Sequence, residues 1–163
     1  MQWQPRIEKA AQLKLVGMHR KMTFANNQTS SLWQHFMPRR TEIKNRLTQD
    51  LISLQVYPPA FNFTNWDMHT EFEKWAAVEV IAIENVPNGM ESFIMESGLY
   101  AVFDYKGLNT DTRIFQYIFG TWLPGNNKYT LDNRPHFERL GEKYKNNDAA
   151  SEEEICIPIK VKE

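Results

Sequence analysis

The sequence predicts an α+β domain in which a β-α-β-β pattern occurs twice, giving a mostly antiparallel sheet and a groove between two halves. Two amphipathic stretches each follow one alternating segment and precede two more. A chain of 163 residues, 42% hydrophobic, is long enough for one core. Each half has a single helix to cover one sheet face, so the halves must pack together. We expect one domain over residues 1–163, with halves at about 8–84 and 94–162.

The first half supplies three expected strands and one helix. Residues 11–24 alternate loosely and predict a long strand. A helix follows at about 31–46, with an apolar face formed by Leu32, Trp33, Phe36 and Met37. Pro38 lacks a backbone donor and disturbs this helix, which we expect to resume after it. Residues 52–57 and 72–83 predict the second and third strands.

The second half repeats this order. A strand is expected within residues 92–105, followed by a helix at about 110–122. That helix has the clearest apolar stripe in the chain, formed by Phe115, Ile118, Phe119 and Trp122. Strands at 134–140 and 155–161 complete the pattern, whereas Glu152, Glu153 and Glu154 are interpreted as a solvated loop before the last strand. Both helices are expected on one side of the sheet.

Composition excludes several classes of protein. The single cysteine, Cys156, cannot form an internal disulfide or a cysteine-based zinc site. The histidines lack metal-ligand spacing, and no glycine-rich phosphate-binding motif is present, so we expect neither metal nor cofactor. The N-terminus has no secretory signal, and no apolar run is long enough to span a membrane. These features predict a cytoplasmic protein without a membrane partner.

Charge is unevenly distributed although the net charge is −1. Residues 1–48 carry nine basic and two acidic side chains, whereas residues 49–100 carry one basic and eight acidic side chains. A nucleic-acid-binding protein is expected to show an uncompensated basic surface. Because the positive and negative thirds compensate one another, we expect no direct nucleic-acid binding.

Aromatic residues are the positive functional signal. Five Trp, ten Phe and six Tyr exceed what packing requires, and together they suggest a pocket for a flat, apolar or cationic small molecule. The aromatic candidates for its lining are Trp33, Phe36, Tyr57, Trp75, Phe103, Tyr105 and Trp122.

Glu138 is the acidic candidate. It lies in the middle of an expected strand, on the face shared with His136 and Leu140. A carboxylate there either points to solvent or faces the groove. In the second case its burial calls for a cationic or hydrogen-bonding ligand.

Ordered motifs along nearly the whole chain resemble the GyrI-like small-molecule-binding family, the effector-binding domain of AraC-type and MerR-type transcription activators. The second half carries the stronger likeness, through residues 98–103, 115–124, 131–138 and 153–159. In the first half the likeness lies in Leu32-Trp33-Gln34-His35-Phe36-Met37-Pro38-Arg39-Arg40 and in Gln55-Val56-Tyr57.

The resemblance implies a tandem pair of strand-helix-strand-strand units related by a pseudo-twofold, with a ligand groove between them. It assigns the family's binding glutamate, on the strand before last, to Glu138. Many members carry an aromatic residue on the last strand where this chain has Cys156, a departure expected to enlarge or open the pocket. No helix-turn-helix fits beside the domain, so the resemblance implies a stand-alone effector domain.

Three functions remain open on this basis. The first is a sensor or sequestering protein for aromatic, including cationic, compounds, in transcription regulation or in drug resistance through multidrug recognition. The second is a hydrolase of reactive cyclopropane-bearing toxins, with Glu138 positioning water beside a tyrosine. The third resembles the gyrase-inhibitor members of the family, which act on a protein partner.

Overall fold

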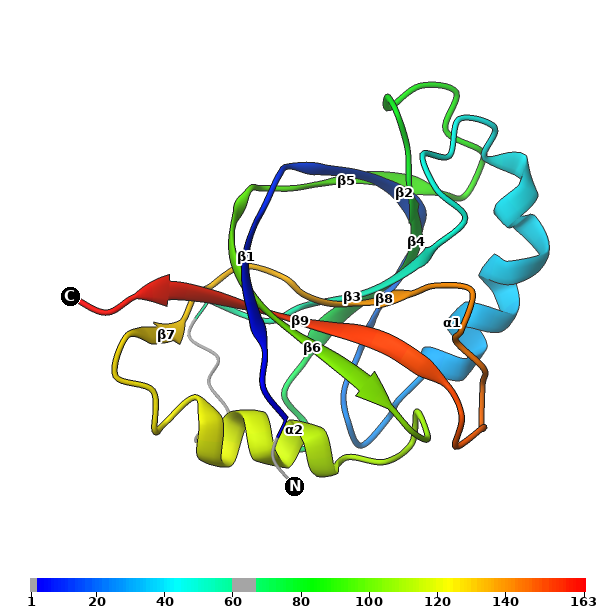
Figure 1. Ribbon diagram of the computed structural model, residues 1–163. Coiled ribbons are helices and arrows are strands. Elements are labelled where there is room, and N and C mark those ends of the chain that lie inside the picture. Colours follow the sequence, from blue (N-terminus) through cyan, green and yellow to red (C-terminus); the bar gives the residue numbers. More distant parts are fainter. Residues whose placement is uncertain (1–2, 60–66) are drawn as a thin grey trace.

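The computed structural model describes residues 3–59 and 67–163, which form one curled antiparallel sheet and two helical segments (Figure 1). In the first half of the described chain the elements are β1 (Arg6–Ala10), β2 (Leu13–Met22), α1 (Thr29–Phe36), the 3-10 helix η1 (Met37–Glu42), β3 (Leu51–Val56) and β4 (Phe72–Glu79). In the second half they are β5 (Glu91–Met95), β6 (Gly98–Lys106), α2 (Arg113–Tyr117), the π-helical turn η2 (Ile118–Trp122), β7 (Tyr129–Leu131), β8 (His136–Leu140) and β9 (Glu152–Val161).

The strand order confirms the predicted fold. Neighbouring strands run in the order β1-β6-β9-β8-β3-β4-β2-β5, with β7 added beside β9, and all the pairs are antiparallel. Each half contributes an equivalent triplet, β2-β4-β3 and β6-β9-β8. The two triplets meet at the β3–β8 ladder, where the pseudo-twofold lies.

The sheet curls because its two end strands belong to longer, kinked strands. Two residues separate β1 from β2, and two separate β5 from β6. The pairs Ala10↔Gly98 and Leu13↔Met95 follow one register across both kinks. The ends of the strand order therefore meet, and Figure 1 shows the ribbon curling round. The expected strand within 92–105 is divided at this kink, and β1 and β7 were not expected.

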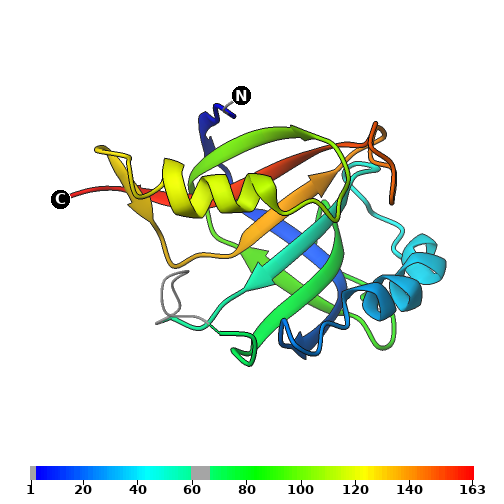
Figure 2. The same ribbon diagram turned by 90° about the horizontal axis from the view of Figure 1, so that it is seen from below.

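Both helices lie on the outer face of the curl, as predicted (Figure 2). The first becomes a 3-10 helix where Pro38 enters, because proline supplies no N–H for the α-helical ladder. The second changes from α to π at Ile118. In Figure 2 α2 crosses in front of β9, and α1 lies apart from it beside the other half of the sheet.

Within the part of the chain that the structure describes, the core consists of three apolar clusters. One fills the inside of the curl and includes Trp75, Tyr100, Phe137 and Cys156. The second packs beneath α1 and includes Phe36 and Val78, and the third packs beneath α2 and includes Phe103 and Ile157. The helices cover the two ends of the outer face, and within residues 3–59 and 67–163 no helix covers the strands between them.

Candidate ligand-binding groove

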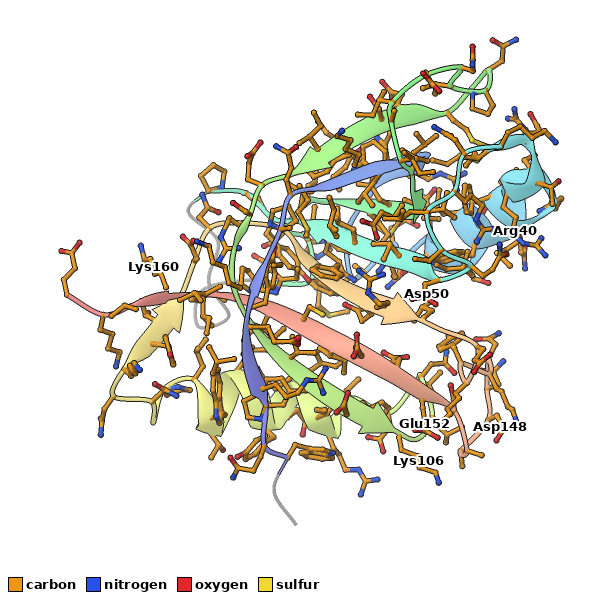
Figure 3. All side chains as sticks on the ribbon, turned by 45° about the horizontal axis from the view of Figure 1, so that its top comes forward. Arg40, Asp50, Lys106, Asp148, Glu152 and Lys160 are labelled. Atoms are coloured by element: carbon orange, nitrogen blue, oxygen red, sulfur yellow. The ribbon has the colours of Figure 1, made fainter. Side chains whose placement is uncertain are left out.

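A groove of about 1750 Å³ lies on the outer face between α1 and α2. Its described lining includes Trp33 and Met37 on one side and Tyr105 and Phe115 on the other. Four polar side chains from the central strands also line it: Ser53, Lys74, Glu138 and Glu153. Figure 3 labels rim residues, with Asp50 near the end of β8 and with Lys106 and Glu152 at neighbouring ends of β6 and β9.

Strand alternation places the polar side chains on this face. Along β4, Trp75 and Ala77 belong to the inner cluster, so Lys74 points outward with Ala76 and Val78. The same rule turns Glu153 outward on β9, because Cys156 belongs to the inner cluster.

Strand register brings these side chains together. Ser53 pairs with Glu138 across the β3–β8 ladder, and Gln55 pairs with Lys74 across the β3–β4 ladder. Side chains of such cross-strand neighbours lie about 5 Å apart at Cβ. Residues distant in sequence therefore form one polar floor.

Glu138 is half-buried and accepts a hydrogen bond of 3.2 Å from Nε2 of Gln55. Burial raises the pKa of its carboxyl above the usual value, while Lys74 and the Gln55 hydrogen bond act in the opposite direction. Burial and the charge of Glu138 together raise the pKa of Glu153 to about 7. The floor thus contains two carboxyl groups that hold protons more strongly than exposed carboxyl groups do.

Lys74 is 5% exposed. Its ammonium has no hydrogen bond and no ion pair within 4 Å among residues 3–59 and 67–163. Burial lowers the pKa of this amine, and the charges of Glu138 and Glu153 oppose that shift. The groove therefore holds a buried basic group without a direct partner in the described chain.

Acidic residues outnumber basic ones around the groove. Seven carboxylates line it, namely Asp50, Asp104, Glu138, Glu142, Glu152, Glu153 and Glu154. The basic residues of the described lining are Lys74, Lys106, Arg139 and Lys143. This excess of negative charge favours a positively charged ligand over a negatively charged one.

The structure brings three of the nine predicted site residues into the groove: Trp33, Tyr105 and Glu138. Tyr57 lies close by, because its ring meets the ring of His136 edge-on at 4.9 Å between centroids. Burial, with a smaller contribution from the charge of Glu138, raises the pKa of its hydroxyl. The contact of any of these residues with a ligand stays a prediction.

The other five predicted residues lie in the packed core or against it. Phe36 is a buried residue of α1 itself, packed in the cluster between that helix and the sheet. Phe103 is buried beneath α2 with its ring edge-on to that of Trp122 at 5.4 Å. Trp75 and Cys156 belong to the inner cluster, on the opposite face of the sheet from the groove. Apolar burial accounts for these positions, and a role of the five in ligand binding stays a prediction.

Sequence reasoning missed Lys74, Glu153 and Gln55. The signal for Lys74 was the same as for Glu138, a charged residue inside an alternating strand. Glu153 was assigned to a solvated loop, but β9 begins at Glu152 and places Glu153 opposite Tyr105. That assignment is corrected, because pairing with β6 extends the strand over all three glutamates.

Among the described residues no group of three or more His, Cys, Asp or Glu side chains is arranged to hold a metal ion. Within the same part of the chain, no helix has the length and apolar character needed to cross a membrane.

Comparison with known proteins agrees with this architecture. The profile of the GyrI-like small molecule binding domain matches residues 4–160. A search of curated protein sequences gave no match.

Solved structures with the same fold include SAV2435 bound to tetraphenylphosphonium, at 16% identity and a TM-score of 0.66, covering 98% of this chain and 94% of that one. The EcmrR C-terminal domain has 13% identity and a TM-score of 0.70, with coverages of 98% and 99%. A hydrolase encoded by lin2189 from Listeria innocua has 10% identity and a TM-score of 0.59, with coverages of 96% and 92%. By the profile match over nearly its whole length, the chain belongs to the GyrI-like small-molecule-binding domain family.

Proposed function

We propose that this protein binds an aromatic small molecule carrying a positive charge in the groove between α1 and α2, and acts as a sensor or sequestering protein for such compounds. The observation that carries the proposal is the pairing of aromatic walls with a carboxylate-rich lining around Glu138. Large organic cations need both features, because their charge is spread over an apolar surface.

The walls and the floor of the groove contribute different interactions to this binding. Trp33 and Phe115 belong to the two helices and offer ring surfaces for stacking and cation–π contact. Glu138 supplies the opposite charge in a site that the ligand itself desolvates, where electrostatic attraction is stronger than in water. Tetraphenylphosphonium, the ligand of the SAV2435 structure, has this combination and serves as the first probe.

A charge-reversed pair of probes tests the proposal. Tetraphenylphosphonium and tetraphenylborate have the same shape and opposite charge, so they separate electrostatic recognition from apolar burial. Isothermal titration calorimetry should detect the phosphonium and show at least about tenfold weaker binding of the borate, a difference of about 1.4 kcal/mol. Equal affinities would mean that the groove binds by apolar contact alone and does not recognise the charge. No binding of either probe would refute the proposal.

A hydrolase function is the second candidate, and the floor of the groove gives it a specific basis. Burial raises the pKa of Glu138, the direction expected for a carboxylate that acts as a general base near neutral pH. Product formation from a cyclopropane-bearing electrophile, followed by mass spectrometry, tests this candidate. Glu138→Gln should then retain binding and lose turnover, whereas for a binding protein the same change weakens cation binding.

Direct DNA recognition is not part of the proposal. We expect the chain to bind DNA only weakly and in a salt-dependent way, since its basic first third is compensated by acidic residues elsewhere. Tight, sequence-selective binding in a gel-shift assay would contradict this expectation. A role with a protein partner, as in the gyrase-inhibitor members, stays an alternative and predicts that no small molecule stabilises the protein.

A further inference from the structure

Lys74 distinguishes this groove from a purely anionic one. Its side chain is 95% buried but lines the groove, so the route to its ammonium is from the ligand side. Two exposed arginines have close carboxylate partners, Arg39 in Glu42 at 2.8 Å and Arg113 in Asp111 at 2.6 Å. Lys74 has no partner within 4 Å in the described chain, although two carboxylates share its floor.

The neighbouring carboxylates do not satisfy this ammonium directly. Oε1 of Glu138 accepts its hydrogen bond from Gln55, and Gln55 is the cross-strand neighbour of Lys74. Glu153 acts on Lys74 only through its electrostatic field. In the open groove, solvent can satisfy the three N–H donors of a lysine. A bulky aromatic ligand displaces that solvent, and a buried charge without a hydrogen-bond acceptor is strongly unfavourable.

We propose that Lys74 is an acceptor-binding position within the groove, and that the ligand is an amphoteric aromatic molecule with an anionic oxygen, most favourably a carboxylate, beside its cationic group. This inference rests on the proposed function, because it adds a second charge of opposite sign to the same ligand. The cationic group lies toward Glu138 and Glu153, and the oxygen receives hydrogen bonds from the Lys74 ammonium. Lys74 repels a cation that lacks such an oxygen, so it acts as a specificity-determining residue.

A matched pair of ligands tests this directly. Pentyltriphenylphosphonium and (4-carboxybutyl)triphenylphosphonium are of similar size and differ in a terminal carboxylate. The acidic excess of the groove by itself favours the first, which carries the greater net positive charge. We expect the wild-type protein to bind the carboxylate-bearing compound about tenfold more tightly, against that general trend.

Variants then assign the preference to Lys74. Lys74→Met retains the length of the side chain and removes its charge, and it should reverse the preference while pentyltriphenylphosphonium binds as tightly as before or more tightly. Lys106→Met is the matched control, because Lys106 also lines the groove but is exposed at its rim. It should retain the preference of the wild type. Lys74→Gln, which keeps a hydrogen-bond donor without the charge, replaces Lys74→Met if that variant does not fold.

The outcomes separate this inference from the proposed function. If wild type and Lys74→Met discriminate between the two phosphonium compounds equally, the inference is overturned while cation binding stands. If neither compound binds, the proposed function fails, and 2-naphthoate against 2-methylnaphthalene decides the role of Lys74. Tighter binding of naphthoate that is lost in Lys74→Met supports an acceptor-binding lysine, and equal or absent binding of the two naphthalenes overturns it.

Discussion

Nε2 of Gln55 donates a hydrogen bond of 3.2 Å to Oε1 of Glu138, joining the two halves of the sheet across the β3–β8 ladder at its centre. Because β3 and β8 are equivalent strands of the two halves, this contact lies close to the pseudo-twofold. It fixes the direction of the Glu138 carboxylate within the groove floor. The central ladder therefore both holds the halves together and positions the acidic candidate for ligand binding.

Replacing Glu138 by Gln should weaken the binding of tetraphenylphosphonium by about 2 kcal/mol, or about 30-fold in Kd. The substitution preserves shape but removes the charge that compensates the cation. Calorimetric titration measures the effect, and neutral triphenylphosphine oxide should bind the variant and the wild type alike. Glu142→Gln removes an exposed rim carboxylate and serves as the control. Similar losses in both variants would mean that only the general field of the groove matters.

Binding of a permanent cation should strengthen as pH rises through neutrality. The pKa of Glu153 is raised to about 7, so this carboxyl is largely protonated below that pH and negatively charged above it. The charged form attracts the cation, and affinity should therefore rise from about pH 6 to about pH 8 and then level off. Calorimetric titrations of tetraphenylphosphonium at several pH values across this range measure the change in affinity. Glu153→Gln should flatten this part of the profile, and an unchanged slope in the variant would assign the pH dependence to another group.

Trp33→Leu should reduce the binding free energy of aromatic ligands by about 1 kcal/mol, because it removes a ring from the groove wall. The leucine retains apolar packing on α1. Trp122→Leu is the control, since Trp122 packs against Phe103 outside the described groove lining. Loss of tryptophan fluorescence quenching by tetraphenylphosphonium in Trp33→Leu, with quenching retained in Trp122→Leu, would place the ligand beside Trp33. The opposite pattern would instead place the ligand beside Trp122, in η2.

The Cys156 thiol should react slowly with a disulfide reagent in the folded protein and rapidly after unfolding. The residue is 3% exposed in the inner cluster, and burial raises the pKa of the thiol. Cys156→Ala should leave the affinity for tetraphenylphosphonium unchanged, because Cys156 and Glu153 occupy opposite faces of β9. A marked change in affinity would instead support the expected role of Cys156 in the pocket wall.

Gly17→Ala should lower the free energy of unfolding by about 3 kcal/mol, in the range of overpacked sites. A Cβ at Gly17 would lie 2.1 Å from the backbone oxygen of Ala76 and 2.6 Å from Cα of Ala77, where β2 and β4 approach closely. Urea denaturation measures the loss. A Cβ at Gly120 would meet no atom within 4 Å, so Gly120→Ala should be neutral or slightly stabilising. Equal stabilities of the two variants would contradict the close approach of the strands.

The sequence predicted the order of elements because the signals for them are local. The stripe containing Phe115 and Ile118 has a helical period, and the alternation along residues 52–57 has a strand period. The tandem arrangement followed from that order, and the profile match agrees with the family likeness found in the motifs. Glu138 was singled out by the same means, since a carboxylate inside an alternating strand stands out without a structure.

Tertiary structure decided which face of each strand is open to a ligand. Alternation shows that Lys74 and Trp75 point in opposite directions, but not that the lysine faces the groove and the tryptophan faces the core. That choice depends on the curl of the sheet and on which parts of its outer face the helices cover. Strand register, fixed by contacts between distant segments, then brings Lys74, Gln55 and Glu138 together. Burial next to other charges gives these groups properties that their identity alone does not determine.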